Sequence, residues 1–275
     1  MSYNNNEKPH VLFVPGAMVD ESIWEDNFRA FFEDLGHKTH VMRFSGTGAR
    51  SDIRNKTTFD DYVAECKSCI ESYPQPPIVI AHSMGGLIAL HAAAQSEIHS
   101  LIALSPAPTH GMGKSLSSLT VDYMFSSGFM PLDMFELMLL HPSNSKRIYK
   151  ETMFSKTCDN EKVAQIQASL RTEAQGVLSA LMNPPAFEKR ALDPEKMLFI
   201  GATGDKIVQA DEVKKTAIDL GSQYKIYNGY SHMFQAESDW TTIAGDIKEW
   251  LYSREDAKPK TFVSPFQMLL SAWEK

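Results

Sequence analysis

Short apolar segments alternate with segments of helical periodicity through most of this chain, and this alternation is the strongest constraint on its fold. The predicted strands are 10–14, 38–44, 77–81, 99–105, 196–202 and 223–229, and the predicted helices are 21–36, 58–73, 86–96, 210–221 and 239–254. Strands separated by helices pair in parallel through right-handed crossovers, with helices on both faces of the sheet. The sequence therefore predicts an α/β fold with a mostly parallel sheet.

The alternation stops in the middle of the chain. Residues 106–193 contain helical segments and no convincing strand. A chain of 275 residues is long enough for one domain that carries such an insertion. The predicted organisation is a core of residues 1–105 and 194–255, a helical insertion of residues 106–193 and a C-terminal tail of residues 256–275.

The tail carries an apolar stripe with the spacing of one helix face. This stripe consists of Phe266, Leu269, Leu270 and Trp273. Ser264 suits the N-cap of a short helix, and Pro265 suits its first position. The stripe is expected to dock on the body of the chain; packing on a second copy is the alternative.

The segment "PIVIAHSMGGLIALHAAA" places Ser83 between a predicted strand and a predicted helix. A turn this sharp forces strained backbone angles on its central residue, so the residues two positions away must be small. Ala81 and Gly85 meet that requirement. The turn exposes the serine hydroxyl at the end of the strand and directs the N-terminus of the helix toward it, where a developing negative charge is stabilised.

The run "AHSMGG" resembles the nucleophile elbow of the α/β-hydrolase superfamily, with Ala81 where a glycine usually stands. The resemblance implies an α/β-hydrolase fold with a helical cap over the nucleophile, and a catalytic triad in the order serine, acid, histidine. Asp205 in "GATGDKIV" follows a predicted strand, and His232 in "NGYSHMF" lies between the last strand and the last core helix. By this resemblance Ser83, Asp205 and His232 form the triad.

Other carboxylates and histidines suit the triad less well. Asp211 and Glu237 each start a predicted helix and are expected to cap it. The chain has nine histidines. His82 is adjacent to the nucleophile on the turn and is expected to point elsewhere, whereas His110 and His141 lie in the insertion and are candidates for a pocket wall.

The resemblance also implies an oxyanion hole made of two backbone N–H groups. One comes from Met84, the residue after the nucleophile. The other comes from the loop "FVPGAMVDESIW" (residues 13–24) after the first strand, which we call the oxyanion loop. By the match of that loop the second donor is Ala17, with Met18 as the alternative. Pro15 replaces the usual histidine of this loop and restricts its backbone.

The activity that the resemblance implies is that of a serine hydrolase. It would cleave a carboxylic ester, a lactone or a thioester of a small, largely apolar substrate through an acyl-enzyme on Ser83. The same fold and triad are compatible with an acyltransferase, a perhydrolase or a cofactor-free lyase, and with a small-molecule receptor whose triad is idle. No cofactor and no metal ion are implied.

The insertion is rich in methionine and phenylalanine, which adapt to irregular apolar ligands. We therefore expect its side chains to line an apolar substrate pocket together with a residue of the oxyanion loop. The alternative is that they only pack the insertion onto the sheet. The candidate pocket residues are Met18, Met124, Phe125, Phe129, Met134 and Met138.

The remaining features exclude several classes of function. A net charge of −7 disfavours a nucleic-acid or anionic-membrane partner. Cys66 and Cys69 lie in a predicted helix without a second pair to complete a zinc site, and "SGTGARS" lacks the third glycine of a dinucleotide-binding loop. The polar N-terminus shows no signal peptide, so we expect a cytoplasmic monomer or homodimer whose partner is a small-molecule substrate.

Overall fold

The computed structural model of the chain describes residues 8–114 and 146–257. Within these ranges one parallel sheet has the strand order β2-β1-β3-β4-β5-β6. The strands are β1 (Val11–Val14), β2 (Thr39–Val41), β3 (Ile78–His82), β4 (Ser100–Leu104), β5 (Met197–Ala202) and β6 (Gln223–Tyr227). The predicted α/β fold with a parallel sheet is confirmed, although β2 is shorter than the predicted strand.

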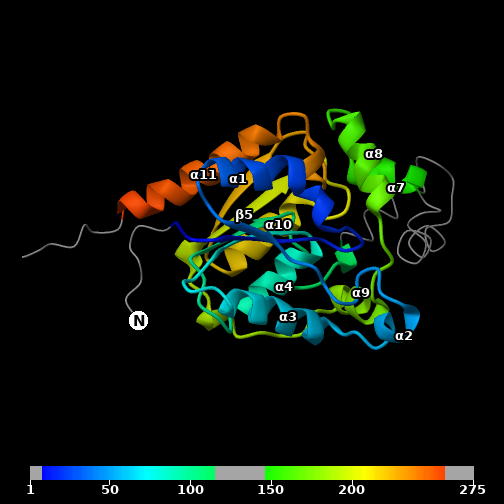
Figure 1. The fold of residues 1–275 in the computed structure, drawn as a ribbon, viewed down its shortest axis with the longest axis horizontal. Coiled ribbons are helices and arrows are strands. Elements are labelled where there is room, and N and C mark those ends of the chain that lie inside the picture. The colour runs from blue at the N-terminus through cyan, green and yellow to red at the C-terminus, as the bar shows by residue number, and fades with distance from the viewer. Residues whose placement is uncertain (1–7, 115–145, 258–275) are drawn as a thin grey trace, which may run out of the picture.

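Helices cover both faces of the sheet, as the alternation predicts (Figure 1). Figure 1 shows α1 and α11 on one side of the sheet and α3 and α4 on the other. Every residue of β1, β3, β4 and β5 is buried, which explains why these strands read as continuous apolar runs. The helices that follow the strands are α1 (Ala30–Asp34), α3 (Phe59–Glu71), α4 (Met84–Ala93), α10 (Ala210–Asp219) and α11 (Trp240–Ala257).

The segment predicted as one helix over 21–36 is not continuous. It consists of a 3₁₀ turn at Glu21–Ile23, a π turn at Glu25–Arg29 and the short α1. Asn27 leaves helical geometry, with φ −141° and ψ −106°, and its buried amide donates to the carbonyl oxygens of Ile23 and Gln235. A buried asparagine needs such partners, so this long-range contact overrides the helical periodicity.

Three helices of the insertion lie within the described residues: α7 (Lys146–Met153), α8 (Asn160–Ser169) and α9 (Gln175–Met182). They connect β4 to β5 and lie beyond one end of the sheet (Figure 1). A short helix, α2 (Ser51–Arg54), was not predicted from the sequence. The boundaries of the insertion remain predictions. The predicted helix of the tail lies outside the described residues, as do five candidate pocket residues: Met124, Phe125, Phe129, Met134 and Met138.

The helices of the described ranges do not have the character of membrane spans. A span needs about 20 apolar residues in a helix. None of the helices in residues 8–114 and 146–257 combines that length with sufficient apolarity.

Candidate active site

Ser83 occupies the turn between β3 and α4, as predicted. Its backbone has φ 53° and ψ −121°, a left-handed region that side-chain-bearing residues rarely adopt. Its N–H donates to the Leu104 carbonyl at 3.0 Å, which ties the turn to β4. A Cβ atom on Gly85 would lie 2.2 Å from the Pro15 carbonyl oxygen. Glycine at position 85 therefore permits the turn to approach the loop after β1.

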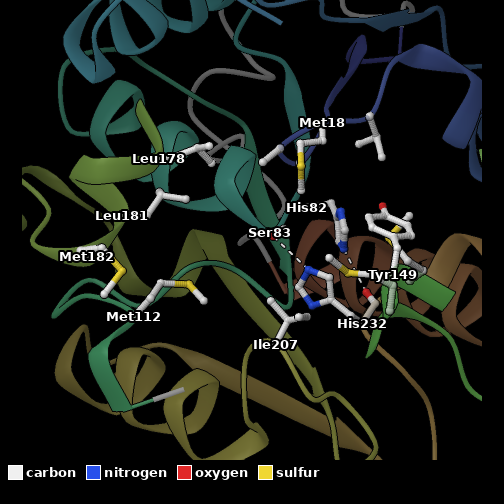
Figure 2. Close-up of a pocket in the computed structure, with 15 residues that line it drawn as sticks. Met18, His82, Ser83, Met112, Tyr149, Leu178, Leu181, Met182, Ile207 and His232 are labelled. Carbon is white, nitrogen blue, oxygen red and sulfur yellow. Dashed lines mark hydrogen bonds between the residues drawn. The ribbon is translucent and has the colours of Figure 1, made fainter. Parts of the chain in front are cut away.

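The structure brings together the three side chains that the sequence nominates. His232 Nε2 lies 2.9 Å from Ser83 Oγ, and His232 Nδ1 lies 2.8 Å from Asp205 Oδ2 (Figure 2). The other carboxylate oxygen accepts the backbone N–H groups of Ile207 at 2.8 Å and Val208 at 2.9 Å. Because the carboxylate is an acceptor, Nδ1 carries the hydrogen and Nε2 presents its lone pair to the serine hydroxyl.

The Glu237 side chain fixes the loop that carries His232. The expectation that Glu237 caps a helix is wrong. Its buried carboxylate accepts the N–H and the hydroxyl of Ser231, both at 2.7 Å. It also accepts the hydroxyls of Ser155 at 3.0 Å and Thr157 at 2.8 Å. These contacts attach the histidine loop to the segment between α7 and α8.

The two amides expected to form the oxyanion hole are free within the described residues. Met84 N is at the first position of α4, and neither it nor Ala17 N donates to another described residue. Met18, the alternative donor, has φ 64°, and its N–H donates to the buried carboxylate of Glu173 at 3.0 Å. The Met18 amide is therefore occupied, whereas the Ala17 amide is available.

Glu173 belongs to the insertion, and sequence reasoning missed it. Besides Met18, its carboxylate accepts the hydroxyl of Tyr62 at 2.5 Å and that of Thr47 at 3.0 Å. Two residues earlier, Arg171 N–H donates to the Met18 carbonyl at 2.8 Å. The segment between α8 and α9 thus holds the peptide groups on both sides of Met18.

His82 lies beside Ser83 and His232, and its hydrogen bond is to the backbone. Its Nε2–H donates to the backbone carbonyl of His232 at 2.9 Å, and its ring centre lies 4.8 Å from that of His232. Burial, with a smaller contribution from His232, lowers the pKa of His82 to about 3. His82 is therefore neutral at physiological pH. His110 does not line the cavity; its ring bonds to the buried carboxylate of Glu212.

The cavity next to Ser83 is lined mainly by apolar side chains (Figure 2). Met18, one of the candidate pocket residues, belongs to its wall. The sequence indicated methionines of the insertion as wall residues but did not identify the ones that the structure places there. Those are Met112, Met153 and Met182; the other wall residues that were not predicted are Val19, Tyr149, Leu178, Leu181, Ile207 and Met233.

The cysteines show no sign of a metal or redox site in the part of the chain that the structure describes. Cys66 is fully buried in α3, and burial raises the pKa of its thiol. Cys69 is partly buried, and burial raises its pKa as well. Within residues 8–114 and 146–257, no group of three or more His, Cys, Asp or Glu side chains is arranged to hold a metal ion.

We expect acid to destabilise the fold, because burial lowers the pKa of two histidines, His82 and His91. Burial lowers the pKa of His91 to about 4 and, as described, that of His82 to about 3, whereas an unfolded histidine titrates near 6.5. As the pH falls from 6.5 to 4, the unfolded chain takes up protons that the native state does not. The free energy of unfolding should therefore fall by up to about 1.4 kcal/mol per pH unit for each histidine.

Urea unfolding of the wild type and of His91→Leu at pH 7 and pH 5 measures this effect. The difference between the two chains isolates His91 from the carboxylates, and the variant should lose less stability on acidification. An identical pH dependence in both chains would show that His91 is protonated equally in the native and unfolded states.

Comparisons with known proteins agree with this architecture. A family model described as the alpha/beta hydrolase family matches residues 11–245. The solved structures that resemble the chain include polyneuridine aldehyde esterase, a hydrolase from Oleispira antarctica and the carboxylesterase CesB from Bacillus subtilis. No curated protein matches the sequence significantly.

The similarity to these structures extends over most of each chain at low sequence identity. Polyneuridine aldehyde esterase is 18% identical to this chain, and the match covers 88% of this chain and 100% of the esterase, with a TM-score of 0.63. The Oleispira hydrolase is 15% identical, and the match covers 90% of this chain and 92% of the hydrolase, with a TM-score of 0.66. The carboxylesterase is 14% identical, and the match covers 90% of this chain and 84% of the carboxylesterase, with a TM-score of 0.61. At identities this low, the structural similarity shows a shared fold and nothing further.

Proposed function

The chain belongs to the alpha/beta hydrolase family, and we propose that it is a serine hydrolase that cleaves a carboxylic ester, lactone or thioester. The observation that carries the proposal is the continuous hydrogen-bonded chain from Asp205 through His232 to the Ser83 hydroxyl. A nucleophile, a base bonded to it and a group that orients the base are the parts that acyl transfer through a serine requires.

In the proposed mechanism His232 Nε2 takes the proton of Ser83 as its oxygen attacks the substrate carbonyl. The Asp205 carboxylate keeps Nδ1 protonated and stabilises the imidazolium that forms. The N–H groups of Ala17 and Met84 bind the oxyanion of the tetrahedral intermediate, supported by the N-terminus of α4. His232 then protonates the leaving alcohol or thiol, and an acyl-enzyme remains on Ser83.

The second half of the reaction uses the same groups in reverse. His232 accepts a proton from a water molecule, whose oxygen attacks the acyl carbonyl, and the same N–H groups bind the second oxyanion. His232 then returns the proton to Ser83 as the carboxylic acid leaves. The apolar wall of the cavity favours a substrate whose acyl or alcohol part is largely apolar.

A labelling and turnover experiment tests the proposal. The wild type should react with a fluorophosphonate probe and hydrolyse p-nitrophenyl acetate and butyrate, and Ser83→Ala should lose both reactions because it lacks the nucleophile. Turnover that persists in Ser83→Ala would refute the proposal. Labelling of the wild type without hydrolysis would also refute it, and would indicate transfer to another acceptor or a receptor with an idle triad.

A further inference from the structure

Tyr149 lines the apolar cavity, and its hydroxyl has no protein partner among the described residues. The residue lies in α7, is 1% exposed and contributes to the cavity wall. Burial raises the pKa of its phenol, so the group stays protonated and is a hydrogen-bond donor. Since no described residue bonds to this hydroxyl, it is free to donate to a ligand.

None of the other polar side chains of the wall has a donor left for a ligand. Of the residues that line the cavity, only four have polar side chains in the described ranges: His82, Ser83, Tyr149 and His232. Ser83 and His232 bond to each other, and His82 Nε2 bonds to the His232 carbonyl. The second ring nitrogen of His82 has no partner, but it is buried and, with the hydrogen on Nε2, it can only accept. Among the described side chains of the wall, the Tyr149 hydroxyl is thus the donor left for a ligand.

Tyr149 and the most apolar part of the wall lie on opposite sides of the nucleophile. Figure 2 shows Ser83 between Tyr149 on one side and Leu181, Met112 and Met182 on the other. An ester whose carbonyl carbon lies at Ser83 Oγ extends in both directions from that point. One part of the substrate therefore meets only apolar side chains, and the other part meets the hydroxyl of Tyr149.

We propose that the Tyr149 hydroxyl donates a hydrogen bond to a second oxygen of the substrate, a ketone or ether oxygen separate from the ester group. This inference rests on the proposed ester hydrolysis and specifies its substrate class: an ester with an oxygen acceptor on one side and a plain hydrocarbon group on the other. A site with a buried donor discriminates against a ligand that leaves the donor unpaired.

Two matched substrate pairs test the proposal and locate the oxygen. The acyl pair is p-nitrophenyl pentanoate and p-nitrophenyl 4-oxopentanoate; the alcohol pair is butyl butanoate and 2-methoxyethyl butanoate, in which an ether oxygen replaces one methylene. In at least one pair the wild type should favour the oxygenated ester by about tenfold in kcat/KM. Tyr149→Phe keeps the ring but has no donor for the second oxygen, so it should abolish that preference.

Tyr73→Phe is the matched control, because Tyr73 is not part of the cavity wall and its variant should keep the wild-type preference. An equal loss on both members of a pair in Tyr149→Phe would overturn the inference, because the hydroxyl would then act on the ester group itself or on folding. An unchanged preference in Tyr149→Phe, or no preference in the wild type, would overturn it as well. Failure of the wild type to hydrolyse any ester would instead refute the proposed function on which the inference rests.

Discussion

Replacing Ser83 with glycine is expected to abolish ester hydrolysis and, at the same time, to raise the free energy of unfolding. Ser83 is held at φ 53° and ψ −121°, and such a backbone conformation costs a side-chain-bearing residue about 1–3 kcal/mol. Glycine adopts it without that strain but loses about 0.5–1 kcal/mol more backbone entropy on folding. The net gain in stability should be about 1 kcal/mol.

The loss of activity follows from the loss of the nucleophile. Removing a serine nucleophile that acts with a bonded histidine lowers kcat by roughly 10⁴- to 10⁶-fold. Ser83→Ala is the matched control: it removes the same hydroxyl but keeps a Cβ atom at the strained position. It should therefore be equally inactive without the gain in stability.

Hydrolysis of p-nitrophenyl butyrate and urea unfolding of the three chains measure both effects. Equal stability of the glycine and alanine variants would mean that position 83 stores no strain. Substantial activity in either variant would contradict the role of Ser83. The combination of inactivity and higher stability in one variant is the signature of a residue held in an unfavourable conformation for chemistry.

The clustering of Ser83, Asp205 and His232 was predictable because it follows from local patterns and from sheet topology. Ser83, Asp205 and His232 each follow a strand, β3, β5 and β6 respectively. In a parallel sheet the carboxyl ends of the strands lie at one edge, so the loops that follow them gather there. A strand–turn–helix pattern, together with the residue order that the resemblance to α/β-hydrolases implies, was therefore sufficient to nominate the site.

The groups that hold the site in place were not predictable, because each acts across a long sequence separation. Glu173 bonds to Met18, 155 positions away. Asn27 bonds to Gln235, 208 positions away, and it breaks a helix that its local pattern favours. From the sequence alone, such residues are indistinguishable from ordinary exposed loop or helix residues. Their roles appear only when the chain is folded around them.

These buried polar groups give the insertion a role besides covering the cavity. Its segment between α7 and α8 contacts the histidine loop through Glu237, and its segment between α8 and α9 contacts the oxyanion loop through Glu173. Both contacts are made by buried carboxylates with several donors each, the kind of hydrogen bond that is strongest and most directional in a protein interior. The insertion thus helps to set the position of two loops of the proposed active site.

The consequence for the oxyanion loop can be measured with Glu173→Gln. A glutamine amide has one acceptor oxygen and one donor nitrogen, whereas Glu173 accepts Met18 N–H on one oxygen and the Tyr62 hydroxyl on the other. The oxygen that binds Tyr62 also accepts the Ala174 N–H at 2.9 Å, so the amide nitrogen faces a backbone N–H in either orientation. If it faces Met18 N–H, the loop shifts and the Ala17 amide moves away from the oxyanion position. Loss of one oxyanion donor lowers kcat by about 10²- to 10³-fold, and we expect about 10²-fold here.

The decisive measurement is the separate effect on kcat and KM. Binding of the ground state depends on the apolar wall, which the substitution leaves in place, so KM should change little while kcat falls. Tyr62→Phe is the control, because it removes a donor from the same carboxylate without touching the oxyanion loop, and its kcat should fall by less than about tenfold. A Glu173→Gln chain that unfolds at a lower temperature but keeps the wild-type kcat would show that Glu173 stabilises the fold without positioning the oxyanion loop.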